Sequence, residues 1–590
     1  ALNPLTFNNY LPHSPQEYRS RGSFRSLLFF RESSTAIFDR CAAFGRQARV
    51  IMDQNSKDAA PSAYSYPLII RQLLHTTPVL GINKEIVNGD LHRYDYPVFL
   101  ERKRSLAGGL AYLGVSPGST VAVMDWDSHR YLECFFAVPM MGAVLHTINI
   151  RLAPDQIVYT INHAEDDVIL VHDDFAPLLE KIRDLIERDV RIIRISDGNT
   201  EWPRSLSYDA GFESLVDTGG SAFVFEDFDE NTRATTFYTT GTTGTPKGVY
   251  FSHRQLVLHT LGFMGALAWN GDHGRFHRDD VYMPITPMFH VHGWGVPYVA
   301  TVMGVKQVYP GRYDPEVLLN LIDREGVTFS HCVPTILHML LSHPLAEKVD
   351  LSHWKVVIGG SALPRGLASR ALGLGIDVFS AYGMSETCPL LTVAQLDADR
   401  LALEADDQIE FRCKTGRPTP LVEIRVVDED GQDIRHDSET TGEIVTRAPW
   451  LTTGYHKEPE LSEALWREGY LHTGDIANVD ENGFIQITDR LKDVIKSGGE
   501  WISSLALEDL VSRLEGVGEV AAIGIPHDKW GERPLVLIVP TKPEVEDLRP
   551  EHVRAHLRKC ADRGEISKWA VPEDVLFVDA IDKTSVGKID

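Results

Sequence analysis

Short apolar runs alternate with longer amphipathic segments along most of the chain after residue 66. Residues 120–124 and 167–172 are short and β-prone, whereas residues 100–113 and 129–141 have the length and spacing of helices. Such alternation is typical of open β-sheets that are covered by helices. The pattern therefore predicts an α/β fold. Further strands are expected at residues 143–148, 281–286, 306–309, 328–333, 355–359 and 377–380, a short helix at 69–74, a helix at 154–163, and a hairpin from 85 to 94 about Asn88-Gly89-Asp90.

The length of the chain and its changes in character predict three regions. A chain of 590 residues is too long for one hydrophobic core. Residues 1–62 are rich in arginine without clear periodicity, and we interpret them as an N-terminal extension. Residues 63–490 then form a large domain of helix-covered β-sheets, and residues 491–590 a small, mobile α+β domain. The boundary falls in the charge-rich stretch Asp489-Arg490-Leu491-Lys492-Asp493.

Composition excludes several classes of protein. With 58 Lys and Arg against 83 Asp and Glu, the formal charge is −25, which argues against a nucleic-acid partner. The six cysteines are scattered without a CxxC pair, which fits a reducing compartment and offers no metal-binding framework. We expect a cytoplasmic protein, with peripheral membrane or organelle association as the alternative. No apolar run reaches the roughly 18 residues that a transmembrane helix needs.

The most informative stretch is Thr239-Thr240-Gly241-Thr242-Thr243-Gly244-Thr245-Pro246-Lys247-Gly248. It follows a β-prone run and is expected to lead into a helix that starts near Ser252-His253. A loop of glycines and hydroxyls lets backbone N–H groups approach a phosphate, and Lys247 supplies a point charge. A Walker A loop ends in Gly-Lys-Ser/Thr, and here lysine precedes glycine. The alternative interpretation is an ordinary surface turn.

Two other motifs have residue types that suit a nucleotide. Tyr382-Gly383-Met384-Ser385-Glu386-Thr387 follows a predicted strand, where a tyrosine ring can lie on a flat base and a carboxylate can bind Mg²⁺. His472-Thr473-Gly474-Asp475 places a carboxylate in a glycine turn, although such a turn is ordinarily only structural. Adjacent Ser385 and Glu386 do not fit a capping box, in which two residues separate the capping residue from the acid.

Together these motifs resemble the adenylate-forming enzymes over residues 66–590. Within that superfamily, the sequence is most similar to bacterial medium- and long-chain fatty acyl-CoA synthetases, and a ligase group acting on 3-(methylthio)propionate shares much of the pattern. The resemblance implies that ATP, Mg²⁺ and coenzyme A are used to join a carboxylic acid to CoA. The reaction would pass through an acyl-adenylate and release AMP and pyrophosphate.

The resemblance also implies roles for individual residues. Catalysis is assigned to Lys588, Glu386, Lys247 and His290, and the metal to Glu386 and Thr239. ATP and AMP are assigned to Thr239, Thr240, Gly241, Thr242, Thr243, Gly244, Tyr382, Gly383, Ser385, Asp475 and Arg490. Lys492 would be the hinge of the small domain, and Lys496, Gly498, Gly499 and Trp501 would border the CoA channel, where glycine leaves room for a thin ligand.

The segment Pro287-Met288-Phe289-His290-Val291-His292-Gly293-Trp294-Gly295 lies where the family has its acyl-site motif. His290 and Trp294 are therefore assigned to the acyl pocket, with Trp294 as a gate; the alternative is that Trp294 is a packed core residue. His290 and His292 are spaced to share a face, but no third ligand for zinc is apparent.

Other classes of activity remain open at this point. An amino-acid adenylation domain would need an acidic anchor near residues 290–294, and none is seen there. A luciferase-like oxygenase would need a special substrate. A non-catalytic nucleotide-binding regulator would be expected to lack Glu386, Asp475 or Lys588, and all three are present. The resemblance further implies a homodimer formed through the large domain.

Overall fold

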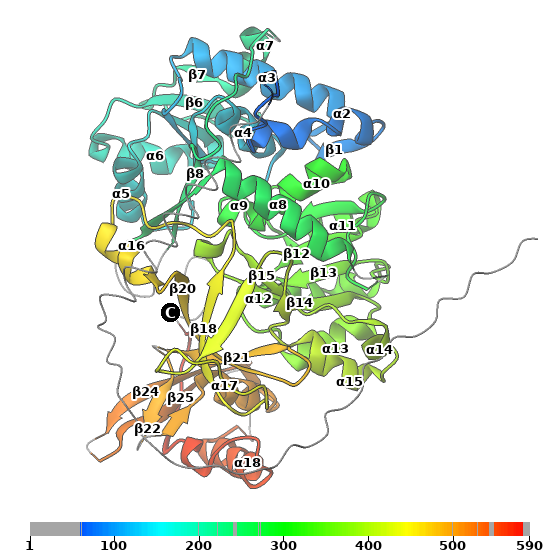
Figure 1. Cartoon of the computed structure of the whole chain (residues 1–590), viewed down its shortest axis with the longest axis vertical. Coiled ribbons are helices and arrows are strands. Elements are labelled where there is room, and N and C mark those ends of the chain that lie inside the picture. The colour runs from blue at the N-terminus through cyan, green and yellow to red at the C-terminus, as the bar shows by residue number, and fades with distance from the viewer. Residues whose placement is uncertain are drawn as a thin grey trace, which may run out of the picture. The chain divides into compact units, whose positions relative to one another are not determined.

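The structure is a computed structural model that describes residues 60, 62–198, 200–220, 222–239, 245–269, 271, 273–491, 493–497, 500–527, 529–541 and 548–581. The chain divides into two units, Ala1–Tyr66 and Pro67–Asp590. All elements discussed below belong to the second unit (Figure 1).

A seven-stranded sheet has the order β7–β6–β5–β3–β4–β8–β9 and is parallel except for its last pair, the antiparallel β8 and β9. Strands β3 and β5 are buried at every position, as expected of parallel strands that are covered on both faces. The strands are β3 (Thr120–Met124), β4 (Val144–Thr147), β5 (Val168–His172), β6 (Arg191–Ile195), β7 (Ala210–Gly211), β8 (Arg233–Thr239) and β9 (Lys247–Ser252). The helices of this region are α3 (Tyr96–Tyr112), α4 (His129–Met140), α5 (Pro154–Ala164), α6 (Ala176–Ile182) and α7 (Phe212–Gly219).

A nine-stranded sheet follows the order β16–β15–β14–β13–β12–β10–β11–β1–β2. Its centre, from β14 to β1, is parallel, and its two ends are antiparallel. The strands are β1 (Glu85–Asn88), β2 (His92–Asp95), β10 (Val281–Pro284), β11 (Lys306–Tyr309), β12 (Phe329–Cys332), β13 (Lys355–Ile358), β14 (Asp377–Gly383), β15 (Leu390–Val393) and β16 (Arg417–Pro418). Its helices are α2 (Thr77–Leu80), α8 (His253–Ala268), α9 (Val291–Trp294), α10 (Val296–Met303), α11 (Pro315–Glu325), α12 (Pro334–Ser342), α13 (Arg365–Gly373), α14 (Ala398–Leu401) and α15 (Ala405–Arg412).

Two smaller sheets follow. The first contains β17 (Glu423–Val427), β18 (Gly442–Arg447), β19 (Trp466–Arg467), β20 (Tyr470–Val479) and β21 (Ile485–Arg490), with α16 (Pro459–Leu465) beside it. The second contains β22 (Ile495–Ser497), β23 (Glu500–Ile502), β24 (Val517–His527), β25 (Gly531–Pro540) and β26 (Asp574–Phe577), with helices α17 (Ser504–Ser512) and α18 (Pro550–Asp562).

The last sheet and its two helices have a hydrophobic core of their own. Ile495, Leu507, Val536 and Val553 are buried in it, and the large sheets belong to other core clusters. A separate core is what the predicted boundary near residue 490 requires, because a domain that turns independently must keep its packing when it moves. The boundary itself stays a prediction.

Most predicted elements occur in the structure. The hairpin at residues 85–94 is formed by β1 and β2, and the predicted strands and longer helices agree within a few residues with the observed ones. The predicted helix at 69–74 is a single 3₁₀ segment, Ile70–Leu74. Among the described residues, no helix combines the length and the apolar character that crossing a membrane requires.

Candidate active site

The glycine- and threonine-rich stretch connects two antiparallel strands. Thr239, the last residue of β8, is paired across the hairpin with Lys247, the first residue of β9. The expectation that this loop leads directly into a helix is therefore wrong, because β9 intervenes. The helix does begin where predicted: Ser252 caps α8 by accepting a hydrogen bond from the Gln255 backbone N–H, and the Gln255 side chain accepts one from the Ser252 backbone.

Lys247, Tyr455 and Glu386 form a group that we call the Tyr455 cluster. The Nζ of Lys247 lies 5.0 Å from the centre of the Tyr455 ring. The Tyr455 hydroxyl donates a 2.7 Å hydrogen bond to Oε1 of Glu386, which is buried just after β14 in the 3₁₀ turn Ser385–Thr387. Burial and then the Glu386 charge raise the pKa of Tyr455, so the phenol remains a donor at neutral pH.

Thr452 holds the backbone of Glu386 in place. Its N–H donates a 2.9 Å hydrogen bond to the Glu386 carbonyl, and its hydroxyl donates to the Tyr250 carbonyl in β9. Glu386 is thus tied both to the segment around residue 452 and, through it, to the β8–β9 hairpin. Sequence reasoning did not find Tyr455 or Thr452, because neither carries a recognisable motif.

Tyr382, Asp475 and Arg490 form a second group, the Tyr382 cluster. The Tyr382 hydroxyl donates a 2.6 Å hydrogen bond to Oδ2 of Asp475, and Nε of Arg490 lies 3.4 Å from Oδ1 of the same carboxylate. Asp475 and Arg490 are also cross-strand partners in β20 and β21. Burial, followed by the Asp475 charge, raises the pKa of Tyr382 well above its ordinary value. Tyr382 and Arg490, from two separate predicted motifs, therefore meet at the carboxylate of Asp475, which comes from a third.

Gly383 is required by close packing between β14 and β15. A Cβ at this position would lie 1.7 Å from the Pro389 carbonyl oxygen, which no side chain can tolerate. The strand register shifts between Tyr382 and Gly383. Gly383 therefore lets the chain turn immediately after Tyr382 and carries Ser385 and Glu386 into their short 3₁₀ turn.

The segment from Pro287 to Gly295 has an unusual backbone. Val291, His292, Gly293, Trp294 and Gly295 all have positive φ angles, a conformation that β-branched and bulky residues rarely adopt. We call it the 287–295 segment. Two residues at the ends of strands of the seven-stranded sheet hold the start of this segment. Asp127, just after β3, accepts a 2.8 Å hydrogen bond from the Met288 N–H, and the hydroxyl of Thr147, in β4, donates one of 2.9 Å to the Phe289 carbonyl.

His292 and Trp294 are both buried by packing. The His292 ring contacts Phe135, Phe237, Phe251 and Tyr298, and neither ring nitrogen has a hydrogen-bond partner among the described residues. Burial and the nearby His290 lower the pKa of His292 to about 3. The Trp294 ring lies 5.1 Å from that of His331 and is so close to Gly359 that a Cβ there would be 3.0 Å from it.

His290, by contrast, is only half-buried and immediately precedes α9. Among the described residues, His290 and His292 are not part of a three-residue group with metal-ligand geometry.

The link to the last sheet is held by Asp489. Its buried carboxylate accepts hydrogen bonds from the Ser504 backbone N–H at 2.6 Å and from the Ser504 hydroxyl at 3.1 Å, while the Ser503 hydroxyl donates to the Thr488 carbonyl. These bonds join the end of β21 to the start of α17 on either side of residue 492. Burial raises the pKa of Asp489.

Several predicted residues lie outside the described residues: Thr240, Gly241, Thr242, Thr243, Gly244, Lys492, Gly498, Gly499 and Lys588. Lys496 and Trp501 are opposite each other in the β22–β23 pair, and only their backbone is described.

Comparisons with known proteins agree with the sequence motifs. Residues 80–456 match the family model described as AMP-binding enzyme, and residues 506–588 match the one described as AMP-binding enzyme C-terminal domain. The chain is 41% identical over 545 residues to a long-chain-fatty-acid–CoA ligase of Thermus thermophilus. The matched region covers 91% of this chain and 97% of that protein. It is 38% identical over 530 residues to a 3-methylmercaptopropionyl-CoA ligase of Ruegeria lacuscaerulensis. That matched region covers 89% of this chain and 96% of that protein.

Among solved structures, the anthranilate CoA ligase AuaEII in complex with anthranoyl-AMP has a TM-score of 0.76 at 22% identity. The match covers 89% of this chain and 96% of that chain. At this identity the likeness concerns the fold alone, and it confirms the predicted α/β architecture.

Proposed function

Since this chain belongs to the AMP-binding enzyme family, we propose that it is an ATP-dependent ligase that joins a carboxylic acid to coenzyme A. The observation that supports this most directly is the Tyr382 cluster. It brings an aromatic ring, a carboxylate and a guanidinium from three separate motifs to one place. In our proposal the Tyr382 ring packs on adenine, and Asp475 and Arg490 bind the ribose hydroxyls.

The triphosphate is assigned to the β8–β9 hairpin and the Tyr455 cluster. Thr239 and Lys247 stand opposite each other at the base of the loop that holds Thr240, Gly241, Thr242, Thr243 and Gly244. The ammonium of Lys247 lies over the Tyr455 ring and attracts phosphate oxygens. Ser385 is assigned to the α-phosphate.

Glu386 and Thr239 are suited to hold Mg²⁺. A carboxylate has about four lone-pair positions, and one Glu386 oxygen accepts the Tyr455 hydroxyl, which leaves acceptor capacity for a hard cation that prefers oxygen ligands. The bound ion would neutralise charge on the departing pyrophosphate. Tyr455 and the Thr452 N–H keep the Glu386 side chain and backbone in place for this role.

The reaction is proposed to proceed in two half-reactions. In the first, a carboxylate oxygen of the acid attacks the α-phosphorus, the bond to pyrophosphate breaks, and an acyl-adenylate forms. Lys588 pairs with the carboxylate and the α-phosphate, and Lys247 and Glu386 stabilise the leaving group. In the second, the CoA thiolate attacks the acyl carbonyl and AMP leaves.

Between the half-reactions, the small domain of residues 491–590 is proposed to turn about Lys492. The turn removes Lys588 and brings the channel bordered by Lys496, Gly498, Gly499 and Trp501 to the acyl-adenylate. Because Asp489 and Ser504 lie on either side of the hinge, their hydrogen bonds would have to break or rearrange during this motion.

A medium- or long-chain fatty acid is the proposed substrate, and 3-(methylthio)propionate or another short acid is the alternative. The buried, apolar surroundings of the 287–295 segment favour an alkyl chain, with His290 and Trp294 lining the acyl site. Identities of 41% and 38% to the two kinds of ligase are too similar to separate these substrates.

Release of AMP and pyrophosphate in the presence of CoA tests the proposal across a panel of acids. The panel runs from acetate and 3-(methylthio)propionate to palmitate, with amino acids as controls. A maximum at medium or long chains supports the fatty-acid assignment, and a maximum at short or sulfur-containing acids selects the alternative. If ATP binds but pyrophosphate is not released with any acid, the chain is a nucleotide-binding regulator.

We further propose that the protein is a cytoplasmic homodimer. The described cysteines Cys134, Cys332, Cys388, Cys413 and Cys560 are all free, as expected in a reducing compartment. A sizing experiment that gives a monomer at working concentration would contradict the dimer.

A further inference from the structure

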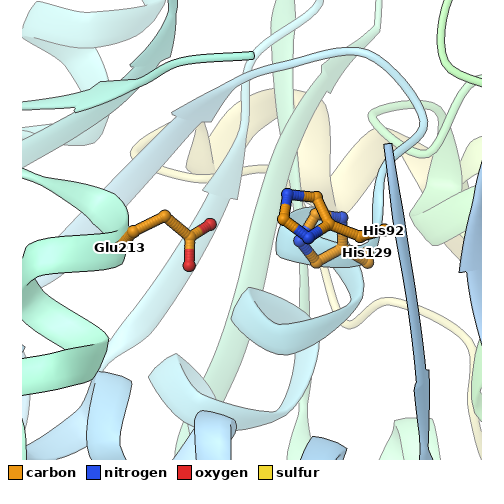
Figure 2. Close-up of side chains that lie close together, drawn as sticks. All are labelled: His92, His129 and Glu213. Atoms are coloured by element: carbon orange, nitrogen blue, oxygen red, sulfur yellow. The ribbon is translucent and has the colours of Figure 1, made fainter. Parts of the chain in front are cut away.

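Two histidines and a glutamate converge in a part of the molecule that the proposed reaction does not use. His92 is the first residue of β2, His129 the first residue of α4, and Glu213 the second residue of α7. Each offers one ligand atom, and these atoms all lie within 4.8 Å of one another. Figure 2 shows the two imidazole rings side by side and the Glu213 carboxylate facing them.

His129 is the residue that makes this group unusual. Its side chain is completely buried, and neither ring nitrogen has a hydrogen-bond partner among the residues that the structure describes. A buried polar atom without a partner costs about 1–3 kcal/mol, so it calls for an explanation. The His92 ring, whose centre is 4.7 Å away, supplies no hydrogen bond to it in this arrangement.

We propose that His92, His129 and Glu213 form a binding site for one zinc-type transition-metal dication. Two imidazoles and a carboxylate are a common donor set for Zn²⁺, with a water or a further ligand completing the tetrahedron. A metal bound to His129 would supply the partner that one of its nitrogens lacks. His92 is exposed, so an ion can enter from solvent without opening the core.

The protonation of His129 is compatible with this role. Burial, and after it the positive charges of Arg130 and nearby groups, lower the pKa of His129 well below its ordinary value. The imidazole is therefore neutral at physiological pH and has a lone pair available for a metal.

The guanidiniums of Arg102 and Arg130 are the main opposing influence. They lie 2.9 Å and 2.7 Å from the two oxygens of Glu213, and positive charge there weakens the attraction for a cation. Each guanidinium, however, also has a carboxylate of its own: Arg102 contacts Glu133 at 2.7 Å and Arg130 contacts Asp197 at 2.8 Å. Three carboxylates thus face two guanidiniums, and Glu213 can share its lone pairs with a metal without leaving either arginine unpaired.

The site would join elements that are distant in the sequence. It would connect β2, at the edge of the nine-stranded sheet, to α4 and α7, which belong to the seven-stranded sheet. A ligand that binds only the folded state stabilises it by RT ln(1 + L/Kd), where L is the concentration of free ligand. Metal binding should therefore raise the melting temperature, independently of ligase activity.

Titration of the chelator-treated full chain with Co²⁺, followed by displacement with Zn²⁺, tests the proposal. The wild type should take up one equivalent of Co²⁺ and show the visible absorption of a tetrahedral nitrogen and oxygen site, without a thiolate band. His92→Gln should weaken binding about tenfold or more and abolish the zinc-dependent rise in melting temperature. Glu213→Gln should weaken binding less, because an amide oxygen is still a donor.

His353→Gln is the matched control, because His353 is exposed and lies just before β13. It should bind Co²⁺ as the wild type does. His129→Gln can disturb the fold, and the decision therefore rests on His92, whose exposed side chain can be replaced without disturbing the core. Equal Co²⁺ affinity in the wild type and His92→Gln, or no binding to the wild type, would overturn the proposal.

Discussion

Polar side chains are held very differently in the two tyrosine clusters and in the 287–295 segment. In the clusters, the hydroxyls of Tyr382 and Tyr455 each donate to a carboxylate at 2.6–2.7 Å. In the 287–295 segment, His292 is fully buried with both ring nitrogens unpartnered among the described residues. A hydrogen bond to a charged group contributes about 1.5–3 kcal/mol, and leaving a buried polar group unpaired costs a similar amount.

This difference suggests that the two clusters and the 287–295 segment have different roles. The clusters hold their carboxylates by hydrogen bonds from within the protein, which suits phosphates and sugar hydroxyls that must be met by fixed charges. The 287–295 segment has a strained backbone and is kept in place by aromatic packing and by Asp127 and Thr147. Strain of this kind is common at functional sites.

The largest effect is expected at Lys588, which is assigned to the reacting carboxylate and the α-phosphate bound by the clusters. Lys588→Ala should reduce acyl-adenylate formation by roughly a hundredfold to a thousandfold, as removal of a key charge in an active site generally does. It should leave thioester formation from supplied acyl-AMP nearly unchanged. Single-turnover assays of the two half-reactions measure this, with Lys583→Ala as the control. Equal losses in both half-reactions would refute the role assigned to Lys588.

A graded effect is expected within the Tyr455 cluster. Glu386→Gln removes the charge assigned to Mg²⁺ and should strongly raise the magnesium-ATP concentration needed for half-maximal rate. Tyr455→Phe removes only the donor that orients Glu386, so its effect should be smaller, about tenfold to a hundredfold if one charged hydrogen bond is lost. Steady-state kinetics at several magnesium concentrations compare the two variants. If Tyr455→Phe equals the wild type, this hydrogen bond does not support catalysis.

Trp294→Ala is expected to change both the stability of the protein and its chain-length profile. Trp294 is 7% exposed and packs against His331 and Gly359, so its loss should cost about 3–5 kcal/mol of unfolding free energy. If it also acts as a gate, the chain-length profile of the enzyme should shift at a temperature where the variant is folded. Trp269→Ala, at an exposed tryptophan, is the control. Reduced stability with an unchanged profile would make Trp294 a packing residue only.

The smallest effect concerns the pH dependence of stability at the start of the 287–295 segment. Burial raises the pKa of Asp127 to about 7. The folded state then holds a proton that the unfolded state has lost, so this group makes the protein less stable as pH rises from about 4 towards 7. Asp127→Asn should remove this slope. As pH rises, its free energy of unfolding should therefore increase relative to that of the wild type by up to about 1 kcal/mol per pH unit. Urea unfolding between pH 5 and 8 measures it, and parallel curves for the two proteins would contradict the assignment.

Much of the fold could be predicted from local sequence, but several features of the site could not. Buried strands such as β3 and β5 are visible as short apolar runs, and Ser252 is recognisable as a helix cap. Strand β9 is not predicted, because the glycine-rich loop is expected to lead straight into a helix. Its alternating residues, from Val249 to Ser252, carried a signal that could have identified it.

The hydrogen-bond partners that the sequence does not predict are distant from each other along the chain. Tyr455 lies 69 residues from Glu386, and Asp127 lies 161 residues from Met288. Only the tertiary fold brings such pairs together. The positive φ angles of Val291, His292 and Trp294 were equally inaccessible, because these residue types normally avoid that conformation and adopt it here under tertiary constraint.

Exchange of labelled pyrophosphate into ATP tests the central claim most directly, since it reports acyl-adenylate formation alone. With its acid but without CoA, the wild type should catalyse the exchange. Asp475→Asn should lose most of it, because the variant no longer offers the carboxylate shared by Tyr382 and Arg490. Exchange that requires CoA, or that is unchanged in Asp475→Asn, would contradict the assignment of the Tyr382 cluster as the nucleotide site.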